Sequence, residues 1–189
     1  FRGNTANGDN VHQGGGALHV AGPVVLSGTR FVSNTATRRT GGGLYQRSGR
    51  AVLTNTTWPS NAAHSSGGGV YHDPALPATD VDVLCVTGSH FEGNVASRGG
   101  GICGEHHEVL LDTDLVNNTA DNFGGGLYTD RRVRVTGGRI EGNQAKGQSG
   151  GGLSARNATV SGTLIFNNRA ATYGGGLSVF WGTAVLTKV

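Results

Sequence analysis

Large apolar residues and asparagines recur along this chain with a fixed spacing. Each copy consists of a large apolar residue, two variable residues, asparagine, one variable residue and alanine, and seven copies occur in 189 residues. The apolar positions are Phe1, Phe31, Trp58, Phe91, Leu115, Ile140 and Ile165, and the asparagines are Asn4, Asn34, Asn61, Asn94, Asn118, Asn143 and Asn168. A short unit repeated in this way predicts a solenoid, in which each unit packs against its neighbours.

Two further elements alternate with this motif. A glycine triplet occurs seven times, and in six of the seven copies an aliphatic residue follows it at once. A short β-branched run also recurs, and in Val133, Arg134 and Val135 it alternates between apolar and polar residues. Alternation with a period of two predicts a β-strand. Each repeat therefore contains three short extended segments separated by turns that carry glycine or asparagine.

These short segments predict a stacked all-β architecture. A unit of roughly 25 residues cannot bury enough apolar surface to fold alone. When units stack, each strand pairs with its copy in the next coil at a spacing of about 4.8 Å. We expect a right-handed parallel β-helix of about seven coils with three parallel sheets, its hand following that of parallel crossovers. It forms a single segment over residues 1–189, and because both chain ends fall inside the pattern, we expect it to continue beyond both ends in a longer protein.

This architecture predicts where the repeated side chains lie. The large apolar residues should point inward and stack on one another, because burial of such a side chain contributes about 1.5–3 kcal/mol. The asparagines should form an internal ladder, in which each amide bonds to the turn and to the asparagine of the next coil. The alternative is a polar stripe that binds a ligand.

The motifs resemble those of the chlamydial polymorphic outer membrane protein family, whose repeats carry FxxN and GGA[ILV]. The first motif appears as Phe31 to Asn34 and as Phe91 to Asn94, and the second appears with glycine in place of alanine, as in Gly41 to Leu44. The resemblance implies an extracellular or cell-surface location and an elongated structural or adhesive role. It implies as partners other domains or subunits of a surface assembly, and glycans, and it transfers no catalytic residue.

Charge and hydropathy restrict the partners further. The formal net charge is +3, and the arginines are scattered along the sequence. Nucleic-acid-binding proteins gather such charge on one face, so we expect no nucleic-acid partner. No apolar stretch of about 18 residues occurs, so the sequence predicts no membrane-spanning helix. We expect a non-enzymatic surface protein without a cofactor.

The candidate for a catalytic or metal-binding site is a row of acidic residues, the acidic edge. Three residues after the aliphatic position, successive coils carry Asp73, Glu105 and Asp130. Stacked carboxylates could hold Ca²⁺ or serve as acid and base on a sugar. A solvated loop edge is the alternative. The acidic edge makes a carbohydrate-active enzyme, of the polysaccharide lyase or hydrolase type, the second hypothesis for function.

Two kinds of covalent modification also remain open. Cys85 and Cys103 lie on adjacent coils and are both expected to point outward, either as a disulfide or as free thiols. Three Asn-x-Thr sequences, at Asn55, Asn117 and Asn157, are expected in turns, where N-glycosylation takes place. Glycans at these sites would make the protein a glycoprotein of the secretory route.

Overall fold

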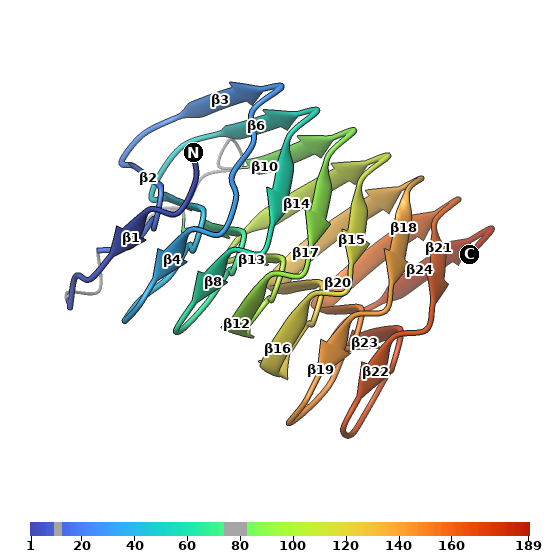
Figure 1. The fold of residues 1–189 in the computed structure, drawn as a ribbon. Helices are drawn as coiled ribbons and strands as arrows, with labels where there is room; N and C mark the ends of the chain where they lie inside the picture. Colours follow the sequence, from blue (N-terminus) through green and yellow to red (C-terminus); the bar gives the residue numbers. More distant parts are fainter. Residues whose placement is uncertain (10–12, 74–82) are drawn as a thin grey trace.

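The protein is a parallel β-solenoid of stacked coils (Figure 1). The computed structural model describes residues 1–9, 13–73 and 83–189, and in these ranges it contains strands and turns but no helix. The strands form three sheets in which every pairing is parallel. The two termini lie at opposite ends of the stack. The fold class expected from the sequence is thereby confirmed.

The first sheet contains one short strand from each of the seven repeats, and seven strands in succession span six turns. It is built on the alanine of the repeated motif. Its strands are β1 (Thr5–Ala6), β4 (Thr35–Ala36), β8 (Ala62–Ala63), β12 (Val95–Arg98), β16 (Thr119–Phe123), β19 (Gln144–Ala145) and β22 (Arg169–Ala170).

The second sheet has twelve strands and joins two ladders side by side. One ladder follows the glycine triplets: β2 (Leu18–Val20), β5 (Leu44–Gln46), β9 (Val70–His72), β13 (Ile102–Gly104) and β23 (Leu177–Val179). The other contains the β-branched runs: β3 (Val24–Ser27), β6 (Ala51–Thr54), β10 (Val83–Thr87), β14 (His107–Leu111) and β24 (Ala184–Thr187). The long strands β17 (Leu127–Thr136) and β20 (Leu153–Ser161) run through both ladders and fuse them.

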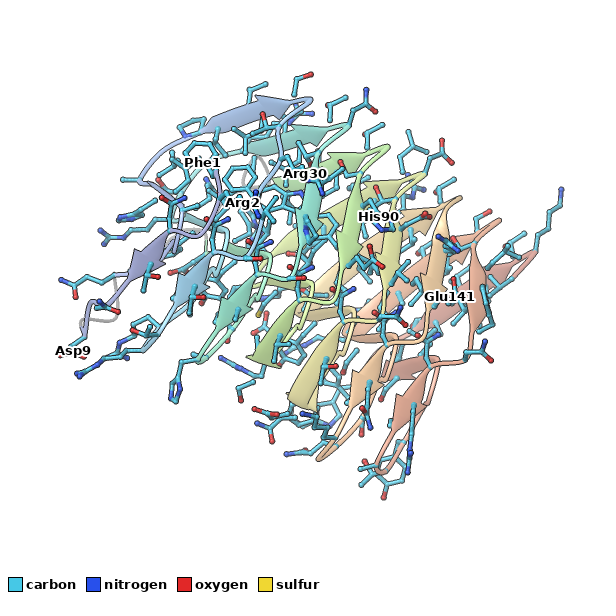
Figure 2. The ribbon with its side chains drawn as sticks, in the orientation of Figure 1. Phe1, Arg2, Asp9, Arg30, His90 and Glu141 are labelled. Carbon is cyan, nitrogen blue, oxygen red and sulfur yellow. The ribbon has the colours of Figure 1, made fainter. Side chains whose placement is uncertain are left out.

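The third sheet contains the large apolar residues. Its strands are β7 (Thr57–Pro59), β11 (His90–Glu92), β15 (Asp114–Val116), β18 (Arg139–Glu141) and β21 (Leu164–Phe166). Its outer face is charged, and Figure 2 labels His90 and Glu141 on it. There Arg139 contacts the Asp114 carboxylate at 3.2 Å and the Glu141 carboxylate at 2.7 Å. Such exposed pairs contribute little to stability, so the inner face determines the fold.

Equivalent residues of successive coils lie directly above one another. Phe91 pairs in register with Trp58 on one side and with Leu115 on the other. The rings of Phe31 and Trp58 stack with centroids 4.1 Å apart and an interplanar angle of 5°. The inner members of this column have no exposed surface, whereas Phe1 at the end of the stack is 52% exposed. The apolar core therefore runs along the solenoid axis and is open only at the ends.

Three corners turn the chain between the sheets in every coil. Each corner has at least one residue with a positive φ, a conformation that glycine adopts without a Cβ penalty. The residue that precedes the ladder asparagine is one of these, with φ between 51° and 64° at Gly3, Ser33, Ser60, Gly93, Asn117, Gly142 and Asn167. Asparagine tolerates this conformation better than other residues that have a side chain.

The glycine triplet lets neighbouring coils approach closely. A Cβ on the middle glycine, Gly68, would collide with the Gly100 carbonyl of the next coil. The third glycine lies against the core, because a Cβ on Gly69 would meet the Phe91 ring at 3.0 Å. In the first repeat Leu18 pairs with Leu44, so that Ala17 occupies the third glycine position.

Candidate functional site

The asparagine motif forms a continuous ladder inside the solenoid. The Asn94 Oδ1 accepts hydrogen bonds from the backbone N–H of Asn61 at 2.9 Å and from its Nδ2 at 3.0 Å. The Asn94 Nδ2 donates to the Asn118 Oδ1 at 2.9 Å and to the Trp58 carbonyl at 2.7 Å. Both donors of the amide group and both lone pairs of its oxygen are thus used.

The same pattern extends through all seven predicted positions. Side chain-to-side chain bonds of 2.9–3.0 Å link Asn4, Asn34, Asn61, Asn94, Asn118, Asn143 and Asn168 in succession. The five inner asparagines have no exposed surface. These amides stabilise the coil register, and their saturation leaves no hydrogen-bonding capacity for a ligand. The geometry is that of the internal ladder and not of a binding stripe.

The predicted core column is also continuous. Phe1, Phe31, Trp58 and Phe91 stack in sequence, and Leu115 and Ile140 continue the column with no exposed surface. The indole N–H of Trp58 donates to the Thr56 hydroxyl at 2.8 Å, which satisfies the one polar atom of that side chain. Ile165, in the last copy, is partly buried against the column.

The acidic edge lies beside a column of tyrosines. The Tyr45 hydroxyl donates to the Asp73 carboxylate at 3.1 Å, and the Tyr71 hydroxyl donates to the Glu105 carboxylate at 3.0 Å. The backbone of Asp73 bonds to Gln46, and that of Glu105 bonds to His72, so the carboxylates follow one another on successive coils. Asp130 lies 3.8 Å from the Arg131 guanidinium. Asp73 and Glu105 are thus each held by a tyrosine of the preceding coil, and all three acids are partly exposed.

Glu105 is the member of this edge whose proton affinity is altered. Burial raises the pKa of Glu105 above its ordinary value of 4.5, and the nearby carboxylates of Asp130 and Asp73 add to the increase. The hydrogen bond from Tyr71 opposes the shift. Burial and the carboxylate of Asp73 likewise raise the pKa of Tyr45. A carboxyl group with a raised pKa keeps its proton to a higher pH than an ordinary carboxyl group does.

The calcium hypothesis receives no support from this arrangement. Within the described ranges, no three histidine, cysteine, aspartate or glutamate side chains lie close enough together to hold a metal ion. Asp73, Glu105 and Asp130 each contact a tyrosine or an arginine instead. The edge therefore offers carboxylates singly and not as a set of metal ligands.

The disulfide alternative is wrong, because both cysteines are free thiols. Cys103 aligns with Tyr128 of β17, whereas Cys85 aligns through Val109 with Arg134 of the same strand. Six residues along a strand correspond to roughly 20 Å, far beyond the separation of about 7 Å that a disulfide tolerates. The expectation that both thiols point outward is also wrong for Cys103, which packs against Tyr45 and Tyr71 without exposed surface. Burial raises the pKa of its thiol.

Two of the three glycosylation candidates lie in turns. Asn55 and Asn117 are exposed and have φ of 51° and 52°. Asn157 does not lie in a turn, because it is part of β20 and pairs with Arg132. Its Oδ1 accepts a hydrogen bond from the Thr183 backbone at 3.0 Å. The prediction of a turn is therefore wrong at Asn157, where the long strand passes through the corner.

A buried polar pair was missed in the sequence. His72 and Glu108 are both inaccessible to solvent, and the His72 Nδ1 lies 4.0 Å from the Glu108 carboxylate. The Glu108 side chain fills space that Gly104 leaves, since a Cβ on Gly104 would collide with it. The sequence feature that could have indicated a buried Glu108 is the alternation in β14, where Glu108 takes an inward position between His107 and Val109.

The part of the chain that the structure describes has no helix long and apolar enough to cross a membrane. Comparisons of the chain with protein-family models, with curated proteins and with solved structures return no match.

Proposed function

We propose that this chain is a non-enzymatic segment of a large extracellular cell-surface or filament protein, in which it acts as a rigid spacer and presents a surface for adhesion or assembly. One observation carries the proposal, namely the unbroken asparagine ladder. Each coil is fixed to the next by amide and backbone hydrogen bonds in one register. A stack of this kind extends by about 4.8 Å per coil and resists bending, because bending would break bonds in every coil.

The location follows from the resemblance of the repeats to those of chlamydial polymorphic outer membrane proteins. The alignment of Leu18 with Leu44 supports it further, because the first repeat then has the sequence Gly15, Gly16, Ala17, Leu18, without the glycine substitution. Asn55 and Asn117 are exposed in turns, where an attached glycan would meet solvent. We therefore propose membership of that repeat class and a surface location, with domains or subunits of a surface assembly as partners.

Antibodies against residues 1–189 test this proposal on intact cells that make the protein. We expect binding without permeabilisation, and loss of the epitope after mild surface proteolysis. Detection only after permeabilisation would overturn the surface location. Small-angle scattering of two copies joined in tandem tests the spacer role, because a continuous stack of twice as many coils should be clearly longer than it is wide, and a spherical profile would contradict it.

The row of Glu105 and its neighbours favours a second candidate, a carbohydrate-active enzyme. The supporting observation is the raised pKa of Glu105 beside Asp73 and Asp130. Cleavage of a polysaccharide by the purified chain, abolished by Glu105→Gln but retained in the matched variant Glu92→Gln on the third sheet, would establish this candidate. Absence of cleavage across neutral and acidic polysaccharides would leave the spacer and adhesion role.

A further inference from the structure

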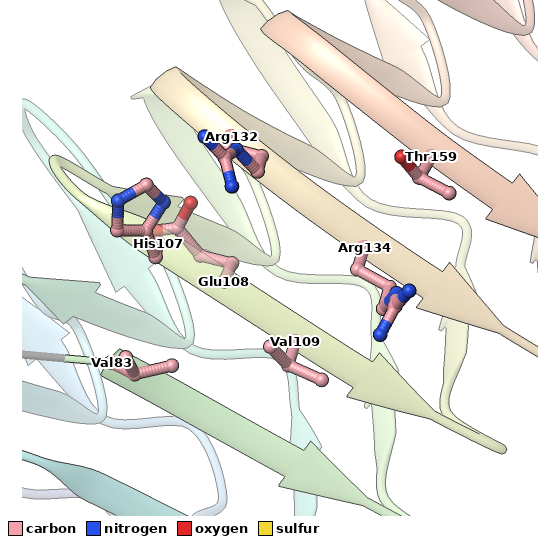
Figure 3. Close-up of a pocket in the computed structure, with 7 residues that line it drawn as sticks. All are labelled: Val83, His107, Glu108, Val109, Arg132, Arg134 and Thr159. Atoms are coloured by element: carbon pink, nitrogen blue, oxygen red, sulfur yellow. The ribbon is translucent and has the colours of Figure 1, made fainter. Parts of the chain in front are cut away.

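A basic hollow lies on the outer face of the second sheet. It has a volume of about 610 Å³, and His107, Arg132 and Arg134 line it together with Thr159 (Figure 3). A second hollow of about 250 Å³ shares His107 and Arg132 with the first. It adds His106, Arg131 and Arg156. The two hollows are therefore neighbours, and their linings together span four coils.

Strand periodicity places these cations on one face. Val133 is buried in the core, so Arg132 and Arg134 on either side of it both point outward. Residues two apart in a strand lie roughly 6.6 Å from each other on the same face. His107 and Asn157 flank Arg132 in register on the neighbouring coils. The hollow is consequently held by backbone pairing and not by a loop.

The charge of the surface is strongly positive. Arg131, Arg132, Arg134 and Arg156 contribute four cations. Among the described residues that line the two hollows, Glu108 is the one carboxylate, and its side chain is turned into the interior with 1% exposure. A grouping of this kind attracts an anionic ligand and pairs with its charged groups.

Two polar atoms of residues that line the second hollow are buried without a partner among the described residues. His106 is nine-tenths buried, and within the described part of the chain its Nδ1 has no hydrogen-bond partner. The Arg156 Nε is also buried without a partner among the described residues. Unpaired buried polar groups are destabilising, and these two lie beneath the exposed cations of the hollow.

An aromatic surface continues from Arg156. Arg156 also lines a third hollow of about 430 Å³, together with Tyr128, Phe180 and Trp181. The rings of Tyr128 and Phe180 are parallel within 9°, with centroids 6.2 Å apart. Aromatic faces stack on the apolar faces of sugar rings, and the Asp130 carboxylate in this hollow can accept hydrogen bonds from hydroxyl groups.

The geometry points to a linear anionic polysaccharide, carrying carboxylate or sulfate groups, that binds across these three hollows with its charges on the arginines and a sugar ring on the aromatic surface. Single-stranded nucleic acid is disfavoured. Its binding sites place aromatic rings along the cationic groove so that successive bases stack, whereas here the aromatic rings lie at one end of the surface. This inference rests on the proposed adhesive function and names the ligand of that surface.

Binding of defined oligosaccharides to the full chain tests the inference. The probes are heparin fragments for sulfate, oligogalacturonates for carboxylate, dextran as the neutral control and a thymidine oligonucleotide as the nucleic-acid control. The test variant is Arg132→Ala with Arg134→Ala. The matched control is Arg30→Ala with Arg169→Ala, which removes the same charge from exposed positions outside these hollows. Unchanged circular dichroism checks that both variants fold.

We expect at least one anionic oligosaccharide to bind, dextran not to bind, and the test variant to lose tenfold or more in affinity. The control variant should lose less than threefold. Trp181→Ala should weaken binding without changing its salt dependence, because it removes stacking and no charge. Equal loss in both double variants, absence of oligosaccharide binding, or preference for the oligonucleotide would overturn the inference. A chain that is surface-exposed and elongated but binds no oligosaccharide would refute this inference and leave the proposed function intact.

Discussion

At the scale of single residues, the ladder asparagines are satisfied by one another, so that the loss of one affects both neighbours. Substitution of Asn118 by alanine removes the acceptor for the backbone N–H and Nδ2 of Asn94 and the donor to Asn143 and Phe91. Each buried polar group left unpaired costs about 1–3 kcal/mol. We expect Asn118→Ala to lower the free energy of unfolding, measured by urea denaturation, by about 3 kcal/mol or more.

Asn122→Ala provides the control for this prediction. Asn122 is only partly buried, and its side chain donates one hydrogen bond, to the Ser97 hydroxyl at 2.8 Å. Its loss should cost about 1 kcal/mol. Equal destabilisation by the two variants would show that the ladder is no more important than an ordinary side-chain hydrogen bond.

The raised pKa of Glu105 makes the stability of the fold depend on pH. Because its pKa is raised in the folded state, the folded chain binds more protons than the unfolded chain at a pH just above 4.5. Stability therefore falls as the pH rises through this interval. We expect Glu105→Gln to lack this decrease, so that its stability relative to the native chain improves as the pH rises above 4.5. Thermal unfolding at several pH values measures the difference.

Tyr71→Phe tests the cause of that shift. The Tyr71 hydroxyl donates to Glu105 and thereby holds its pKa lower than burial alone would place it. Its removal should make the decrease of stability with pH steeper. A pH profile identical in the native chain and in both variants would contradict the assignment to Glu105.

At the scale of the elements, the glycine triplets determine how closely two coils approach. A Cβ at Gly125 would collide with the Gly151 carbonyl and with the Gln144 backbone, neither of which can move without loss of sheet hydrogen bonds. We expect Gly125→Ala to lower the free energy of unfolding by about 1–3 kcal/mol. At Gly22 an added Cβ would meet open space, and Gly22→Ala should leave stability unchanged or raise it slightly. Urea denaturation of both variants is the measurement.

The positions of the strands were largely predictable from the sequence, because the same pattern of apolar residues, glycines and asparagines recurs in every coil. The runs Val24–Ser27, Ala51–Thr54 and Ala184–Thr187 coincide with strands, since their apolar alternation is the alternation of the sheet. The corner at Asn157 was not predictable, because the fusion of two ladders in β20 depends on pairing with β17 and not on local residues. The burial of Cys103 depends likewise on the tyrosines of other coils.

At the scale of the whole molecule, most packing joins adjacent coils, so stability should add up coil by coil. We expect removal of residues 162–189, the last repeat, to lower both the free energy of unfolding and its dependence on urea by roughly the share of one coil. The remaining chain should unfold in a single transition. Complete loss of structure on truncation would show that the coils are not interchangeable units.

The bonds between asparagine side chains all run in one direction, since each Nδ2 donates to the asparagine oxygen of the coil that follows, and its second N–H donates to a carbonyl of the coil before. A coil inserted anywhere meets an acceptor ahead of it and a donor behind it, whichever repeat it copies. Duplication or deletion of whole repeats in the gene would therefore change the reach of the rod without creating a mismatched junction, which lets length vary among descendants while the cross-section stays constant.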